Sequence, residues 1–228
     1  MKKIISLLHE SQIMGKMIHT LDYCLQKELK DCESVLDLGC GSSSPLKKCN
    51  NIKYSIGVDI YSPYIQSSRL KKIHNKYIKK NITSARFKPR SFDAVLLIEV
   101  LEHLSCRDGL NILKKAELWA RKKIIISTPN GFFLQNIHKD GNPWQKHMSG
   151  WSIHKLEEIG FVCKGLAGLK YLRAESDKSN KNYDLTSTIR FKPKLLWFVI
   201  STISQIITYY YPSLAFELFC VKKINGKI

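Results

Sequence analysis

The strongest constraint on the fold is an alternation of short apolar runs with helical patterns along the chain. Four runs bounded by turn-forming residues have the length of a strand buried on both faces, at 34–38, 54–60, 94–98 and 123–128. Between them, residues 63–75 and 108–121 place apolar side chains on one side of a helix. Buried strands that alternate with helices predict a parallel sheet with helices on both faces.

Weaker signals extend this pattern to seven strands. Completing the alternation requires a strand at 77–83, although lysines weaken its signal, and strand patterns resume at 161–166 and 214–221. A short helix after Ser152 ends at Gly160. We predict an α/β fold: a Rossmann-like, doubly wound, mostly parallel seven-stranded sheet. The predicted organisation is one domain over residues 1–228, with an N-terminal helical region at 1–32 and an insertion at 170–212.

The composition indicates a folded protein with excess positive charge. Among 228 residues, 44% are hydrophobic and 25% are charged, close to the globular average. The net charge of +18 suits anionic partners, but it comes mainly from lysine, whereas arginine is the preferred reader of phosphates and bases. The charge therefore favours a nucleic-acid substrate only weakly. The first ten residues lack a secretory pattern, and the seven cysteines form no C-x-x-C pair, so we expect reduced, mostly buried thiols and a cytoplasmic location.

The first apolar run ends in a turn suited to a nucleotide-like ligand. Residues 35–41 read Val-Leu-Asp-Leu-Gly-Cys-Gly, and a helix can start after Ser42. Glycines let the backbone approach a ligand, and the helix start offers free N–H groups. Asp59 ends the second run 18 positions after Gly41, where a carboxylate can accept both ribose hydroxyls of an adenosine. Ser44 replaces the third glycine of the dinucleotide fingerprint, which argues against NAD, and no Walker-type lysine follows.

Four segments in order resemble the class I S-adenosylmethionine (SAM)-dependent methyltransferases, particularly those with an Asp-Leu-Gly-Cys-Gly turn. These segments are 35–41, 57–60, 91–104 and 126–131. The resemblance implies SAM as cofactor and a cofactor site made of Asp37, Gly39, Cys40, Gly41, Asp59, Ile60, Asn81, Ile82 and Glu99.

Each part of that site has an implied role. Asp37 and the two glycines would surround the methionine part of SAM, Asp59 would hold the ribose, and Asn81 with Ile82 would hold the adenine. The chain departs from the family pattern at Ser43, where a third glycine is common, and at Asn81, where an acidic residue is common. An amide oxygen can still accept a hydrogen bond from the adenine amino group.

Titratable residues gather directly after the run at 94–98. Glu99, Glu102 and His103 follow it, and His147 lies in a loop beyond the next strand. The arrangement resembles that of small-RNA 2′-O-methyltransferases and ubiquinone-pathway O-methyltransferases. It implies that these four residues bind a divalent metal that activates the acceptor hydroxyl, with Glu102, His103 and His147 as catalytic residues. Such a donor set suits Mn²⁺, Fe²⁺ or Zn²⁺ better than Mg²⁺. The alternative is that Glu102 and His103 only cap or orient the next helix.

Two later segments are candidates for contact with the acceptor. The polar, aromatic loop at 142–151 suits a substrate gate, although Trp144 and Trp151 can equally be packing anchors. Residues 195–211 form an uncharged amphipathic helix with an isoleucine-rich face. It is too polar to span a membrane. We predict a lid that buries Ile203 and Ile207 against the core; the alternative is a peripheral membrane helix.

These observations predict methyl transfer from SAM to an oxygen of a small molecule, a lipid-linked intermediate or a glycan. An RNA methyltransferase is the alternative that the charge favours, although no separate RNA-binding module is present in the sequence. A third possibility is a SAM-binding partner protein without catalysis, against which the intact Gly39, Gly41 and Asp59 argue.

Overall fold

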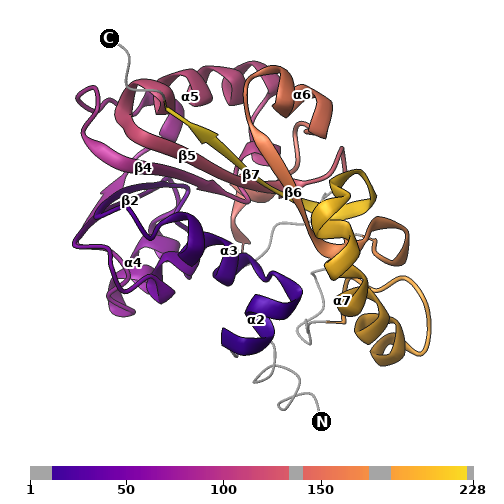
Figure 1. The fold of residues 1–228 in the computed structure, drawn as a ribbon. Coiled ribbons are helices and arrows are strands. Elements are labelled where there is room, and N and C mark those ends of the chain that lie inside the picture. The colour runs from indigo at the N-terminus through magenta and orange to yellow at the C-terminus, as the bar shows by residue number, and fades with distance from the viewer. Residues whose placement is uncertain (1–11, 134–140, 175–185, 225–228) are drawn as a thin grey trace.

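The fold is built on one seven-stranded sheet (Figure 1). The computed structural model describes residues 12–133, 141–174 and 186–224. The strands lie in the order β3-β2-β1-β4-β5-β7-β6, and all neighbours are parallel except those of β7. The strand bounds are β1 Ser34–Leu38, β2 Tyr54–Asp59, β3 Lys76–Lys79, β4 Phe92–Ile98, β5 Ala120–Pro129, β6 Val162–Leu169 and β7 Ala215–Lys223. The predicted fold class is confirmed.

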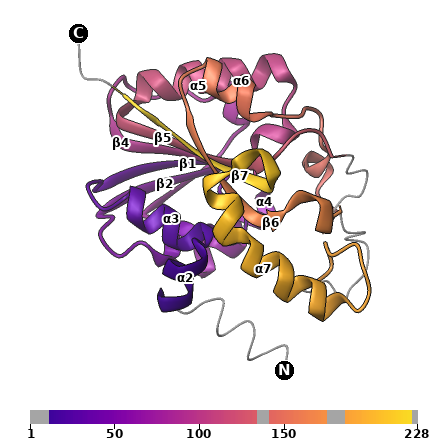
Figure 2. The same ribbon diagram turned by 45° about the vertical axis from the view of Figure 1, so that its right-hand side comes forward.

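Helices cover both faces of this sheet. The α-helices within the described residues are α2 Gln12–Ile18, α3 Leu21–Glu28, α4 Ser62–Leu70, α5 Cys106–Trp119, α6 Ile153–Glu158 and α7 Lys194–Tyr210. Helices α5 and α6 lie on one face, and α3 and α4 on the other (Figures 1 and 2). Residues 1–11 of the predicted N-terminal region and 175–185 of the predicted insertion lie outside the described residues.

Buried aliphatic side chains fill the space on each face. One core cluster joins Leu36 and Val95 of the sheet to Ile112 of α5 and Leu156 of α6, and a second joins Leu96 to α3. The central strands β1 and β4 are almost fully buried, which explains their uninterrupted apolar sequences. Strand β3 at the sheet edge is shorter than predicted, because its outer lysines are exposed and charge at an edge opposes further pairing.

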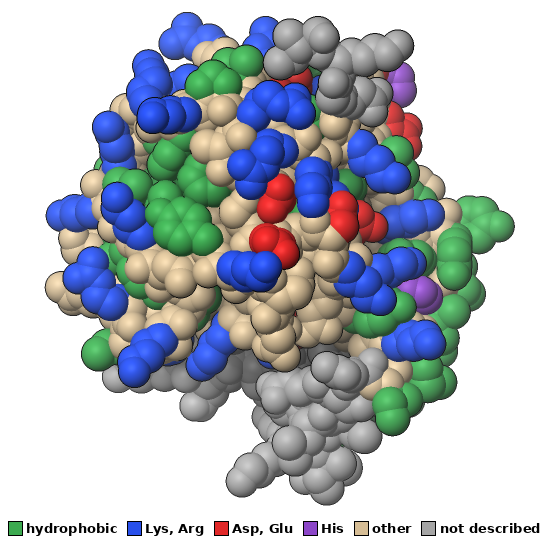
Figure 3. Space-filling model, turned by 60° about the vertical axis from the view of Figure 1, so that its left-hand side comes forward, with side chains coloured by type: hydrophobic (Ala, Val, Ile, Leu, Met, Phe, Trp, Pro, Cys, Tyr) green, Lys and Arg blue, Asp and Glu red, His purple; other side chains and the backbone are tan. Residues whose placement is uncertain are grey.

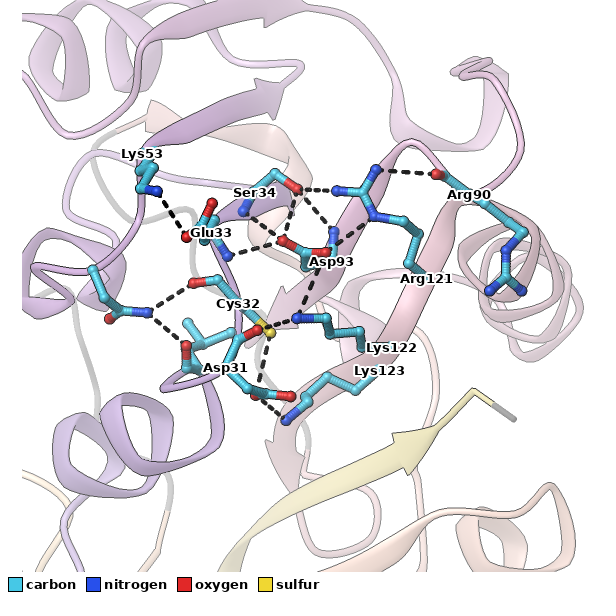
Figure 4. Close-up of polar contacts among 12 residues, drawn as sticks. Asp31, Cys32, Glu33, Ser34, Lys53, Arg90, Asp93, Arg121, Lys122 and Lys123 are labelled. Atoms are coloured by element: carbon cyan, nitrogen blue, oxygen red, sulfur yellow. Dashed lines mark hydrogen bonds and ion pairs between the residues drawn. The ribbon is translucent and has the colours of Figure 1, made fainter. Parts of the chain in front are cut away.

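The amino ends of β1, β4 and β5 are joined through one buried carboxylate (Figure 4). Asp93 Oδ2 accepts hydrogen bonds from the backbone N–H of Glu33 at 2.9 Å and of Ser34 at 3.1 Å, and Oδ1 accepts one from Arg121 Nε at 3.0 Å. Burial acts to raise the pKa of Asp93, but these bonds and the Arg121 charge lower it to about 2. The carboxylate is therefore strongly stabilised in its ionised form.

The prediction that all seven cysteines are reduced is wrong at one pair. Cys163 and Cys220 form a disulfide between β6 and β7, where the antiparallel register places them opposite each other. No local pattern indicates this pairing, because the two residues are 57 positions apart. Burial raises the pKa of Cys24, Cys32 and Cys49 to about 12, as expected for unreactive thiols.

Helix α7 is amphipathic as predicted, but its orientation is the reverse of the prediction. It packs along β6 at the edge of the sheet (Figures 1 and 2). Its polar side chains are buried, whereas Ile203 and Ile207 are 60% and 58% exposed. The reason lies in β6, where Gly165 and Gly168 leave room only for small side chains on the facing helix. No helix among the described residues is long and apolar enough to cross a membrane.

Candidate active site

A cavity of about 630 Å³ opens at the carboxyl ends of β1, β2 and β4, where doubly wound folds bind their ligands. All nine predicted cofactor residues line it: Asp37, Gly39, Cys40, Gly41, Asp59, Ile60, Asn81, Ile82 and Glu99. These residues lie at the ends of four strands, β1 to β4, that are distant in sequence. The structure therefore brings the predicted cofactor residues together in one place.

The turn after β1 requires glycine for two separate reasons. Gly39 and Gly41 have φ angles of +73° and +58°, a region that L side chains rarely adopt. A Cβ on Gly39 would also lie 2.5 Å from Val100 Cγ2, whereas one on Gly41 would meet no atom within 4 Å. Gly39 is thus fixed by both conformation and packing, and Gly41 leaves open space on the cavity side.

Asp59 holds this turn against the end of β2. Its Oδ2 accepts a hydrogen bond from the Gly41 N–H at 2.9 Å, and its Oδ1 accepts one from the Tyr61 N–H at 2.8 Å. Burial raises the pKa of Asp59, while these two hydrogen bonds act against the rise. Each oxygen retains a further lone pair, so the carboxylate can still accept the hydroxyls of a ribose.

Asp37 forms a buried pair with a histidine that the sequence analysis missed. His74 Nε2 lies 3.4 Å from Asp37 Oδ2, and both side chains are almost fully buried. Burial raises the pKa of Asp37 and lowers the pKa of His74, so both groups are driven toward their neutral forms. A ligand ammonium group beside Asp37 would favour the carboxylate, and ligand binding is therefore coupled to its ionisation.

Asn81 begins the 3₁₀ helix Ile82–Ser84 that closes one side of the cavity. Its Oδ1 accepts hydrogen bonds from the Thr83 N–H at 3.0 Å and from Thr83 Oγ1 at 2.9 Å. The amide oxygen is therefore already used in the local turn. Recognition of an adenine amino group by that oxygen stays a prediction, and it would require exchange of one of these bonds.

The loop at 142–151 supplies the other wall. Trp144, which is 53% exposed, lines the cavity together with Asn142, Gln145 and Met148. Trp151 is instead fully buried, and its Nε1–H donates to Ser149 Oγ at 3.0 Å. The two tryptophans thus have different roles, one in the cavity wall and one as a packing anchor.

Several lining residues were not predicted. They come from α3, the turn after β1, α4, the 3₁₀ helix Ile82–Ser84, the residues around β4 and the start of α5: Leu21, Ser42, Ser43, Pro45, Tyr64, Thr83, Ile98, Val100, Leu104, Ser105 and Asp108. The Ser105 hydroxyl accepts the Asp108 N–H at 3.1 Å as the N-cap of α5. A capping pattern was visible in the sequence here, but its closeness to the cavity depends on the fold.

Three of the four predicted metal residues lie together beside the cavity. Glu102, His103 and His147 each present a ligand atom, and these atoms lie within 4.8 Å of one another. His147 Nδ1 lies 2.8 Å from the Phe133 carbonyl oxygen, and His103 Nδ1 lies 3.2 Å from that of Lys146. Donation to these carbonyls fixes the tautomer that carries its lone pair on Nε2, the form that binds metals. His103 also lines the cavity.

Glu99 lies outside this group of three, which differs from the four-residue prediction. Its Oε1 accepts a hydrogen bond from Ser127 Oγ at 2.7 Å, and the same hydroxyl lies 2.5 Å from Glu217 Oε1. One hydroxyl hydrogen cannot serve both carboxylates, so a proton on one of them completes the arrangement. Burial raises the pKa of Glu217, which favours a proton on this carboxylate.

Residues 36–122 match a family model described as a methyltransferase domain. An uncharacterised protein of Methanocaldococcus jannaschii is 30% identical over 122 residues, which cover 48% of this chain and 47% of that protein. The chain thus spans about half the length of this relative.

Two solved structures share the fold. The methyltransferase domain of bacterial CtHen1 is 17% identical, with 95% of this chain and 100% of that chain covered and a TM-score of 0.54. A SAM-dependent methyltransferase from Archaeoglobus fulgidus is 18% identical, with coverages of 92% and 98% and a TM-score of 0.51.

The fold and the cavity define a Rossmann-like domain whose glycine turn lies at the cavity edge where such folds hold nucleotide-like ligands. Within residues 36–122 the chain matches a methyltransferase domain, and its fold is shared with solved methyltransferases, one of them SAM-dependent.

Proposed function

We propose that this protein transfers the methyl group of SAM to an oxygen of a small molecule, a lipid-linked intermediate or a glycan. The observation that carries the proposal is the continuity of the cavity, which runs from the Gly39–Gly41 turn and Asp59 to His103 and Trp144. Its volume of about 630 Å³ lies within the range of ligand pockets. A cofactor and part of an acceptor can therefore share one cavity.

Methyl transfer from a sulfonium is an in-line displacement, so alignment is the main task of the protein. In this proposal Asp59 and the glycine turn hold SAM at one end, and Trp144 covers the acceptor at the other. His103, which lines the cavity, lies on the acceptor side with Met148. An acceptor hydroxyl must also lose a proton, which requires a base or a Lewis acid nearby.

We propose that Glu102, His103 and His147 hold a divalent cation that lowers the pKa of the acceptor hydroxyl. The donor set fits such an ion, because both imidazoles are held by backbone carbonyls and Glu102 Oε2 is oriented by Thr128 Oγ1 at 3.0 Å. Two imidazoles and one carboxylate favour Mn²⁺, Fe²⁺ or Zn²⁺ over Mg²⁺.

Calorimetry with SAM tests the cofactor site. We expect Asp59→Ala to weaken SAM and S-adenosylhomocysteine by roughly 10- to 150-fold, because a charge-assisted hydrogen bond contributes about 1.5–3 kcal/mol. Glu33→Gln at the opposite edge of the sheet is the control and should bind normally. Equal affinity of Asp59→Ala and wild type would contradict the assigned site. The acceptor class is then identified by incorporation of labelled methyl from SAM into lipid, glycan and RNA fractions.

Removal and restoration of metal tests the second proposal. Once an acceptor fraction is known, we expect chelator to abolish methyl transfer and Mn²⁺ or Zn²⁺ to restore it. Glu102→Gln and His147→Ala should lose activity while still binding SAM, and the exposed His154→Ala on α6 is the matched control. Full activity in chelator would assign Glu102 and His103 to orientation of the local turn instead.

RNA is the second candidate acceptor, because the net charge of +18 suits a polyanion. On the face drawn in Figure 3, however, basic side chains are spread over the whole surface around a few acidic ones rather than gathered in a stripe. Salt separates the two candidates: RNA binding should weaken steeply with added salt, whereas transfer to a neutral acceptor should change little.

A further inference from the structure

The solvent-facing side of helix α7 is apolar, although the same helix carries polar residues on its buried side. The residues of this outer face are all exposed, and they are Leu196, Val199, Ile200, Ile203, Ile206, Ile207 and Tyr210. Single exposed aliphatic residues are ordinary, but a continuous row along one helix indicates a surface that something covers.

The inner side of α7 explains why the helix cannot turn this row inward. A Cβ on Gly165 would lie 2.1 Å from the Thr208 carbonyl oxygen, and one on Gly168 would lie 2.0 Å from that of Ser201. The backbones of β6 and α7 therefore touch directly. Isoleucine side chains do not fit in this contact, and small side chains such as Ser201 do.

Hydrogen bonds fix the same orientation. The Leu169 N–H donates to Ser204 Oγ at 3.0 Å, and Gln205 Nε2 donates to the His19 carbonyl oxygen at 2.7 Å. Rotation of α7 would leave these polar groups without their partners, which costs about 1–3 kcal/mol for each buried group. The outward position of the isoleucine row is thus enforced by the fold.

The surroundings of the row are basic and aromatic. Residues 186–216 contain Arg190, Lys192 and Lys194 but no Asp or Glu, and these three basic side chains are exposed. At the other end of the helix, Lys164 Nζ lies 5.4 Å from the ring centroid of Tyr209. Aromatic and cationic side chains that flank an apolar row are typical of helices at a lipid–water interface.

We propose that the outer face of α7 docks onto the surface of an anionic lipid bilayer, with the helix axis parallel to the membrane plane. The apolar row runs from Leu196 to Tyr210 of this helix, which is about 21 Å at 1.5 Å per residue. Charge selects lipid as the occupant, because a +18 protein with no carboxylate along this segment is attracted to an anionic surface. Neighbouring α2, which contacts α7, adds the exposed Ile13 and Met17.

Vesicle sedimentation tests this proposal without reference to activity. The full chain is mixed with phosphatidylcholine vesicles that contain either no phosphatidylserine or about 30% of it, and we expect at least tenfold tighter binding to the anionic vesicles. Ile203→Asp with Ile207→Asp should weaken that binding more than tenfold and leave the melting temperature unchanged, because both residues are exposed. Lys192→Glu with Lys194→Glu should weaken only the preference for anionic vesicles.

The matched control is Leu70→Asp with Leu118→Asp, two exposed leucines on α4 and α5, which should bind vesicles like the wild type. Equal vesicle binding by the isoleucine variant and the wild type would overturn the proposal. So would a wild-type protein that ignores vesicles and forms a dimer that the isoleucine variant loses, since a second copy would then cover the row. A strongly lowered melting temperature of the isoleucine variant would also overturn it, because the row would then be buried in solution.

Discussion

Replacement of Asp93 by asparagine should remove a definite amount of stability whose size follows from its hydrogen bonds. The Asp93 carboxylate accepts two backbone N–H groups and the Arg121 guanidinium, and it is about 7% exposed. Its pKa is lowered from 3.8 to about 2, although burial alone would raise it. Each tenfold change in proton affinity corresponds to about 1.4 kcal/mol, so the ionised group contributes on the order of 2.5 kcal/mol at neutral pH.

The way in which the stability contribution of Asp93 changes with pH follows from the linkage between proton binding and folding. A depressed pKa in the folded state stabilises the protein above the unfolded pKa, and the contribution is lost as the pH falls through the folded pKa. For Asp93 the full contribution is present at pH 7, about half remains near pH 3, and little remains at pH 2. The difference between wild type and Asp93→Asn should shrink along the same course.

Urea unfolding followed by tryptophan fluorescence at pH 7, 4 and 3 measures this difference. We expect Asp93→Asn to lose about 2–3 kcal/mol at pH 7. Glu33→Gln is the control, because its ion pair with Lys53 is largely exposed and should contribute less than about 1 kcal/mol. Equal stability of Asp93→Asn and wild type at pH 7, or a loss that does not decrease on acidification, would refute the reasoning.

Two further changes test the site by stability and binding. Gly39→Ala should destabilise the protein by roughly 2–4 kcal/mol and weaken SAM at least tenfold, because its Cβ meets Val100; Gly41→Ala should cost only about 1–2 kcal/mol. Thermal melts measure the stability of both variants and calorimetry measures their SAM affinity. Equal losses in Gly39→Ala and Gly41→Ala would contradict the packing argument. Glu217→Gln should gain stability relative to wild type as the pH rises, since burial raises the pKa of Glu217 and its protonated form is lost at high pH. Urea unfolding at pH 5 and pH 8 checks this, and a pH-independent difference would count against a protonated Glu217.

The sheet and the cofactor turn were predictable because their signals are local. Strands buried on both faces read as uninterrupted apolar runs, and the predicted run at 34–38 coincides with β1. The turn requires positive φ angles at positions 39 and 41, which few residues other than glycine adopt. Edge strand β3 was the weakest prediction, because its exposed positions carry lysines that hide the apolar pattern.

The errors have a common physical origin in long-range packing. Periodicity predicts which residues of α7 share a face, but Gly165 and Gly168 on another element decide which face is buried. The disulfide of Cys163 and Cys220 likewise depends on the register of two strands separated by the α7 insertion. His74 lies in the connection between α4 and β3, and its contact with Asp37 of β1 depends on how these distant segments pack together.

The difference between local signals and long-range packing also explains why the cofactor was easier to predict from the sequence than the methyl acceptor. The predicted SAM site is built from backbone geometry at strand ends, and that geometry requires particular residue types such as Gly39 and Asp59. The proposed acceptor side is lined by His103 of the turn after β4 and by Trp144 and Met148 of the 142–151 loop, and each of these residues could serve another purpose. These residues come together only in the fold, which places the 142–151 loop against the turn after β4. There the Met148 N–H donates a hydrogen bond to the Glu102 carbonyl oxygen at 2.7 Å. A change of acceptor specificity is therefore expected to arise through this contact, with the glycine turn left intact.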